Sequence, residues 1–190
     1  RNVMDIIVKY IDELLEKSTP EAPMWNIEKI RQGLKSNWNY IDGVMIKAVL
    51  QMYDVTKDEK YLKFADNFID YRVHEDGTID GYSIGEKNID NVNAGKTLFE
   101  LYDLTGKEKY RKAIDLVYSQ IEIMPRCNNE ARSFWHKDIY PNQVWLDGMY
   151  MGQPFYLEYE TKFNNRKNYP DIFAQFKYVI ENMKNPLNGL

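Results

Sequence analysis

Hydrophobic residues recur at helical spacing along most of the chain, which predicts an all-α protein. Some of the predicted helices have one apolar and one polar face, as half-exposed helices do. The others are apolar on nearly every side, which is typical of buried helices. The two kinds alternate, and no strand pattern competes with them. Half-exposed helices are expected at about 3–15, 58–73, 107–123 and 170–184, buried helices at about 39–54, 89–104 and 147–162, and a long connection at 18–37.

The alternation is also a repeat in the sequence. An aspartate opens each buried segment, and a tyrosine follows 11 or 12 residues later. The motif Thr-x-x-Glu follows at 56–59 and again at 105–108, which predicts a capping box at the start of the next helix. Each unit is then a loop, a buried helix, a tight turn and an amphipathic helix. Stacked units of this kind form either an open superhelix or a closed ring, the α/α toroid.

The repeat places Asp42, Asp90 and Asp147 at equivalent N-terminal ends of the buried helices. In a toroid those ends converge on one mouth, next to the long loops 74–88 and 125–146. The N-terminus of a helix stabilises a carboxylate by roughly 0.3–1 kcal/mol at exposed sites, so each aspartate can simply cap its helix. Convergence of all three on one mouth favours a functional site.

Composition narrows the class of protein. A chain of 190 residues, 44% of them hydrophobic, is long enough to form one domain, residues 1–190, with a real core. The formal net charge of −4 argues against a general nucleic-acid binder, and no apolar run is long enough to span a membrane. The single cysteine, Cys127, cannot form an internal disulfide or hold zinc alone. We expect no cofactor and no metal, and, without a signal-peptide pattern, a cytoplasmic location.

Aromatic residues make up 14% of the chain and are densest at 134–151. Tyrosine and tryptophan suit carbohydrate sites, which need both apolar surface and hydrogen-bonding groups. They are also common in protein cores and interfaces. This segment contains Trp135, His136, Lys137 and Asp147. A carboxyl group among tryptophans loses hydration, which raises its pKa and suits it to general-acid work. The alternative is a loop packed by its own aromatic residues.

Pro154 lies seven residues after Asp147, inside the last predicted buried helix. It cannot donate a hydrogen bond to the carbonyl of residue 150, and such a proline bends or delays a helix. The backbone beside Asp147 is therefore expected to be irregular.

Three blocks of the sequence resemble glycoside hydrolase family 105, the unsaturated rhamnogalacturonyl hydrolases, and the related family 88, the unsaturated glucuronyl hydrolases. The blocks are Trp-x-Tyr-x-x-Gly at 38–43, Asn-Ile-Asp-Asn at 88–91, and His136-Lys137 followed by 144–151 and Pro154-Phe155. The last is the most specific, because eight consecutive residues agree in type and order. The resemblance covers nearly the whole chain and implies an (α/α)6 toroid.

The resemblance also implies an activity: release of a 4,5-unsaturated uronic acid from the non-reducing end of lyase-generated oligosaccharides of the pectin or rhamnogalacturonan type. These families hydrate the double bond, and the resulting hemiketal collapses and releases the aglycone. Asp147 matches the residue that serves as acid and base, and Asp90 matches a second aspartate that assists it. Positions that line or neighbour the uronate subsite are His136, Lys137, Gln143, Trp145, Tyr40 and Trp38.

The family toroid has twelve helices, and about seven are expected here. The chain is therefore expected to be the N-terminal half to two-thirds of the domain, and inner helices left exposed in such a half-ring favour self-association. Two alternatives stay open: a non-catalytic helical-repeat module that binds sugar or protein, and an inactive fragment of such a hydrolase. A toroid sugar epimerase ranks lower, because such enzymes generally use paired histidines and this chain has only His74 and His136.

Overall fold

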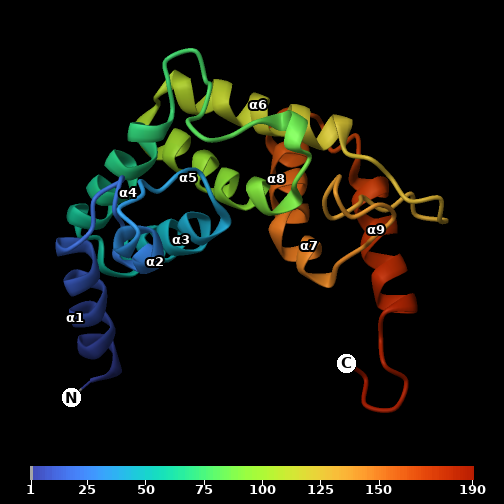
Figure 1. Ribbon diagram of the computed structural model, residues 1–190, viewed down its shortest axis with the longest axis horizontal. Helices are drawn as coiled ribbons and strands as arrows, with labels where there is room; N and C mark the ends of the chain where they lie inside the picture. The colour runs from blue at the N-terminus through green and yellow to red at the C-terminus, as the bar shows by residue number, and fades with distance from the viewer. Residues whose placement is uncertain (1) are drawn as a thin grey trace.

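A computed structural model describes residues 2–190, which are helical with irregular connections (Figure 1). In this range the only β-type pairings are isolated bridges, so the all-α prediction is confirmed. The α-helices are α1 (Val3–Glu16), α2 (Ile27–Arg31), α3 (Tyr40–Thr56), α4 (Glu59–Arg72), α5 (Lys96–Thr105), α6 (Glu108–Ile123), α7 (Leu146–Met151), α8 (Gln153–Phe163) and α9 (Tyr169–Asn182). The 3-10 helices are η1 (Met24–Asn26), η2 (Ile84–Glu86) and η3 (Ile89–Gly95).

The helices follow one another around an arch (Figure 1). α3, α5 and the α7–α8 pair form its inner side, and α4, α6 and α9 lie outside them. Within each pair, the inner helix contacts the outer helix that follows it. This is the layer order of an α/α toroid, present here as an incomplete ring, and it confirms the predicted architecture.

A continuous hydrophobic core fills the space between the two layers. Its fully buried members come from inner and outer helices alike: Ile46 and Leu50, Leu98 and Phe99, Tyr110 and Ile114, and Phe155. Burial of a side chain of this kind contributes roughly 1.5–3 kcal/mol, so the core holds the layers together. The nearly all-apolar pattern of the inner helices reflects their contacts on several sides.

The turns from inner to outer helices explain the sequence repeat. Tyr53 near the end of α3 donates to Glu59 at the start of α4, with 3.4 Å between the oxygens. Tyr102 of α5 donates in the same way to Glu108 of α6, at 3.2 Å. The repeated tyrosine and glutamate therefore bridge equivalent turns.

The predicted capping boxes are wrong. The hydroxyl of Thr56 donates to the carbonyl of Met52, and the hydroxyl of Thr105 donates to that of Leu101. Both threonines thus belong to the end of the preceding helix, and Asp58 caps α4 through its side chain. Each threonine oxygen also accepts from the N–H two residues on, but the N-cap positions of α4 and α6 are Asp58 and Lys107.

Residues 2–190 contain nine α-helices rather than about seven. One addition is α2, which with η1 lies inside the expected long connection 18–37. The other arises because Gly152 separates α7 from α8, with Pro154 in the first turn of α8, as a proline that delays a helix predicts. In addition, the first part of the expected helix 89–104 is the 3-10 helix η3.

A buried ion pair fixes the 18–37 connection to the helices. Arg72 of α4 is 2% exposed, and its Nη2 lies 3.2 Å from a carboxylate oxygen of Asp42, which is 1% exposed. The same guanidinium donates to the carbonyls of Pro20 and Ser36. One side chain therefore ties α3, α4 and both ends of the connection together.

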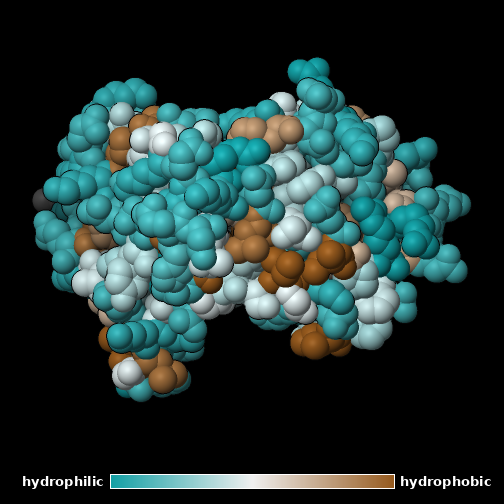
Figure 2. All heavy atoms as spheres, turned by 90° about the horizontal axis from the view of Figure 1, so that it is seen from above, coloured by the Kyte–Doolittle hydropathy of each residue, from teal (hydrophilic) through white to brown (hydrophobic). Residues whose placement is uncertain are grey.

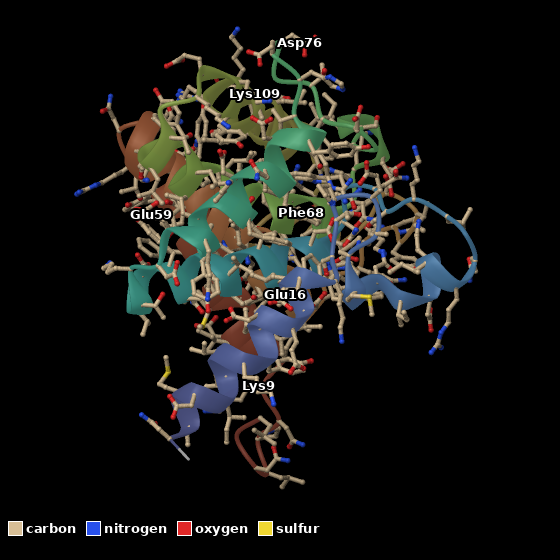
Figure 3. The ribbon with its side chains drawn as sticks, turned by 90° about the vertical axis from the view of Figure 1, so that its left-hand side faces the viewer. Lys9, Glu16, Glu59, Phe68, Asp76 and Lys109 are labelled. Atoms are coloured by element: carbon tan, nitrogen blue, oxygen red, sulfur yellow. The ribbon has the colours of Figure 1, made fainter. Side chains whose placement is uncertain are left out.

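The face of the molecule seen from above is mostly hydrophilic, with separate apolar patches (Figure 2). α1 is amphipathic as predicted, and Ile11 and Leu15 pack against the core. Its N-terminal turns leave Val3, Ile6 and Tyr10 exposed, and Figure 3 shows this end, with Lys9, projecting from the body. In the part of the chain described, no helix combines the length and the apolar character needed to cross a bilayer.

We expect Arg72→Met to lower the free energy of unfolding by about 3–5 kcal/mol, because it leaves the carboxylate of Asp42 buried without its cation. Urea unfolding followed by circular dichroism measures the change. Lys177→Met is the matched control, because the pair that Lys177 forms with Glu181 is exposed and 3.8 Å long. Equal losses in both variants would contradict the assigned role of Arg72.

Candidate active site

Asp90, His136 and Asp147 come together where η3 and α7 begin. One nitrogen or oxygen atom from each of the three side chains lies within 4.8 Å of the others. Asp90 is in the first turn of η3 and Asp147 in the first turn of α7, as the repeat predicts. His136 comes from the loop between α6 and α7. The arrangement places two carboxyl groups beside one imidazole, with Asp147 exposed to solvent.

The third aspartate of the repeat has a structural role. Asp42 also lies in the first turn of its helix, but it pairs with Arg72 and accepts a hydrogen bond from Nε1 of Trp25 at 2.9 Å. Its carboxylate is fully enclosed by these contacts. Only two of the three aspartates therefore lie at the candidate site.

Two basic side chains contact Asp90. Nε2 of His136 lies 2.9 Å from one carboxylate oxygen, and Nζ of Lys137 lies 3.1 Å from the other. Both imidazole nitrogens are buried, and neither makes a well-aligned hydrogen bond. Burial alone would raise the pKa of Asp90, but His136 and Lys137 together hold it below its ordinary value. Asp90 is thus kept as a carboxylate.

Backbone hydrogen bonds hold the loop in this position. The N–H of Ile89 donates to the carbonyl of His136 at 3.0 Å, and the N–H of Asp138 donates to the carbonyl of Lys87 at 3.1 Å. Across the loop itself, the N–H of His136 donates to the carbonyl of Gln143 at 2.8 Å. The two basic residues are therefore positioned by the main chain on either side of Asp90.

Trp145 stacks between two rings of its own loop. Its ring lies parallel to the imidazole of His136, with 4.4 Å between centroids, and nearly parallel to the ring of Tyr140 at 5.2 Å. Its Nε1 donates to the side-chain oxygen of Gln143 at 2.9 Å. Since 40% of Trp145 stays exposed, it both orients His136 and borders the open side of the site.

Gly148 allows α7 to approach His136 closely. A Cβ atom at this position would lie 3.1 Å from Nδ1 of the imidazole, which is tighter than ordinary contact. A larger residue directly after Asp147 would push the helix away from His136. The Asp147-Gly148 dipeptide is therefore a steric requirement of the site.

The Trp38–Gly43 block supports η3 from the side of α3. Trp38 is 4% exposed, and its Nε1 donates to the carbonyl of Asn91 at 2.8 Å. The side chain of Asn93 donates to the carbonyl of Tyr40, and a Cβ on Gly43 would lie 2.7 Å from the Cα of Ala94. Contrary to the sequence-based expectation, Trp38 is buried against η3 and presents no face to a sugar. Tyr40 is 43% exposed.

Sequence reasoning missed two residues near the site. Gln120 of α6 donates to the carbonyl of Asn88 and so fixes the segment that precedes Asp90. Lys96, at the start of α5, is 9% exposed and donates to the carbonyl of Tyr150. Their only signal in the sequence is a polar residue at a position that the helical pattern assigns to the interior.

The same three groups have the residue types of a cation site, so metal binding needs separate consideration. The ammonium group of Lys137 already supplies positive charge beside Asp90. A divalent ion there would be repelled by that ammonium. The expected absence of a metal and of a cofactor stays a prediction.

Two comparisons with known proteins bear on this site. The sequence matches the model of Glycosyl Hydrolase Family 88 over residues 10–190. A solved structure of a family 105 glycoside hydrolase from C. acetobutylicum ATCC 824 is similar to this chain, with 43% sequence identity and a TM-score of 0.78. The match covers 85% of this chain and 45% of that one, so the chain spans less than half the length of that relative.

The family match over residues 10–190, together with the toroidal fold, places the chain in the class of glycoside hydrolases. Within that class, the chain belongs to Glycosyl Hydrolase Family 88 and is similar to a member of family 105. The resemblance seen in the sequence is thereby confirmed.

We expect Lys137→Met to raise the pKa of Asp90, because a positive charge 3.1 Å from the carboxylate is lost while its burial is unchanged. Carbon-13 NMR of labelled aspartate carboxyl groups, followed over pH, measures the change. Lys177→Met, which alters the outer surface of α9, should leave this titration where it is. An unchanged titration in Lys137→Met would show that His136 alone sets the state of Asp90.

Proposed function

We propose that the native polypeptide carrying this chain releases a 4,5-unsaturated uronic acid from the non-reducing end of lyase-generated oligosaccharides, of the pectin or rhamnogalacturonan type. The observation that carries the proposal is the pair of aspartates in unlike surroundings at one mouth. Asp147 is exposed and has no ion-pair partner among the described residues, whereas Asp90 is held by His136 and Lys137. Unlike surroundings suit two carboxyl groups to different roles.

Asp147 is the proposed acid and base. Its carboxyl group gives a proton to C4 of the unsaturated sugar, and the carboxylate then takes a proton from the water that adds at C5. The product is a hemiketal at C5. Its bond to the ring oxygen breaks to give a ketone at C5 and a hemiacetal at C1, and that hemiacetal collapses to an aldehyde as the aglycone leaves as its alcohol. Protonation of the double bond needs no nucleophilic attack at the anomeric carbon, so the second carboxylate need not be a nucleophile.

The remaining site residues fit the recognition of a uronate. Lys137 keeps 22% of its side chain exposed beside Asp90 and can face the sugar carboxylate. Tyr40 and Trp145 offer partly exposed aromatic surface to the apolar side of a sugar ring. Gln143 is exposed and adjoins Trp145. Trp38, being buried, contributes by holding η3.

We expect Asp147→Asn to lower kcat by roughly 10²–10⁴-fold, the usual range for loss of a general acid–base group. The assay uses the native polypeptide and a lyase-generated unsaturated disaccharide, with loss of the ultraviolet absorbance of the double bond as the readout. Asp138→Asn is the matched control, because Asp138 is an exposed aspartate of the same loop.

A near-wild-type rate for Asp147→Asn would remove Asp147 from the mechanism. No loss of absorbance with the wild-type native polypeptide would overturn the proposed activity. Calorimetric binding of the disaccharide without turnover would instead favour the non-catalytic sugar-binding module.

A further inference from the structure

Pro154 deprives one backbone carbonyl of its helical partner. In an α-helix, the carbonyl of residue 150 accepts a hydrogen bond from the N–H of residue 154. Proline has no N–H, and α7 ends at Met151, before the first turn of α8. The carbonyl of Tyr150 therefore needs a donor from elsewhere, since an unpaired carbonyl in a packed region is unfavourable.

Lys96 supplies that donor from another helix. Its Nζ lies 2.5 Å from the carbonyl oxygen of Tyr150 and 3.8 Å from the centroid of the same residue's ring. The lysine is only 9% exposed, so its ammonium group has lost most of its water. The carbonyl dipole and the face of the ring offset that loss. Both contacts join the first residue of α5 to the last turn of α7.

This contact bears directly on Asp147. α7 has only six residues, so its first turn, which carries Asp147, and its last turn, which Lys96 holds, move together. The charges of the two side chains also interact. Burial, and then the nearby charge of Lys47, lower the pKa of Lys96 to about 8, while the charge of Asp147 acts in the opposite direction.

We propose that Lys96 is a positioning residue of the candidate active site: its amine replaces the N–H that Pro154 lacks, holds α7 against α5, and thereby fixes the carboxyl group of Asp147. The proposal rests on the proposed function for its catalytic meaning. The anchoring of α7 is testable without turnover.

The first experiment compares Lys96→Met, Lys96→Arg and the control Lys177→Met in the native polypeptide. Lys177 lies on the outer helix α9, where its pair with Glu181 is exposed. Displacement of a catalytic group by about 1 Å costs on the order of 10²-fold in rate. We expect Lys96→Met to lower kcat by roughly 10- to 100-fold with little change in KM. Lys96→Arg should recover part of kcat, and Lys177→Met should retain the wild-type kcat.

The second experiment restores the missing donor through Pro154→Ala, which supplies an N–H to the carbonyl of Tyr150. Backbone hydrogen exchange in α7, residues 146–151, should become about tenfold faster in Lys96→Met, because the last turn of α7 loses its contact with Lys96. The double variant combines Lys96→Met with Pro154→Ala. Its exchange rate and its kcat should both approach those of the single variant Pro154→Ala. Exchange requires no substrate, so it tests the anchor even if the wild type shows no turnover and the proposed function fails.

Wild-type kcat and wild-type exchange in Lys96→Met would overturn the proposal. A double variant no better than Lys96→Met would also overturn it, because the amine would not be replacing the lost N–H. If Lys96→Met does not fold, the double variant should fold, and its failure to do so would count against the proposal in the same way.

Discussion

The site depends on one piece of main-chain pairing. The loop after α6 lies against the segment before η3 through the hydrogen bond from Ile89 to His136 and the bond from Asp138 to Lys87. Consecutive residues of an extended segment point to opposite sides. His136 and Lys137 nevertheless both contact Asp90, because each lies near a different oxygen of its carboxylate. Loss of this pairing would separate His136 and Lys137 from the carboxylate and leave Asp90 half-buried without its two partners.

Helical periodicity predicted most of the architecture, because packing against two layers leaves a clear alternation of apolar faces. The bounds of α3, α4, α6 and α9 lie close to those expected. The pattern missed α2, because Pro20 and Pro23 indicate a connection at this place. The side chain that holds this connection is Arg72, which comes from a helix much later in the sequence. Hydrophobic patterning carries no information about such long-range polar contacts.

The candidate site was predictable to a similar degree. The repeat predicted that Asp90 and Asp147 lie at one place. It could not show that Arg72 and Trp25 enclose Asp42. Aromatic residues near the mouth predicted surfaces for stacking on sugars. Trp38 instead packs against η3 and donates a hydrogen bond to it. A residue type indicates what a side chain is able to do, and only the packing determines whether its surface stays available.

Gly43 and Gly148 add a constraint of another kind. One lets α3 approach η3 and the other lets α7 approach His136, and neither carries a chemical group. The distance between the carboxyl groups of Asp90 and Asp147 thus depends partly on the absence of a side chain at these two glycines. A side chain added at either glycine would push apart the elements that carry Asp90 and Asp147, so the geometry of the site depends on two residues that take no part in its chemistry.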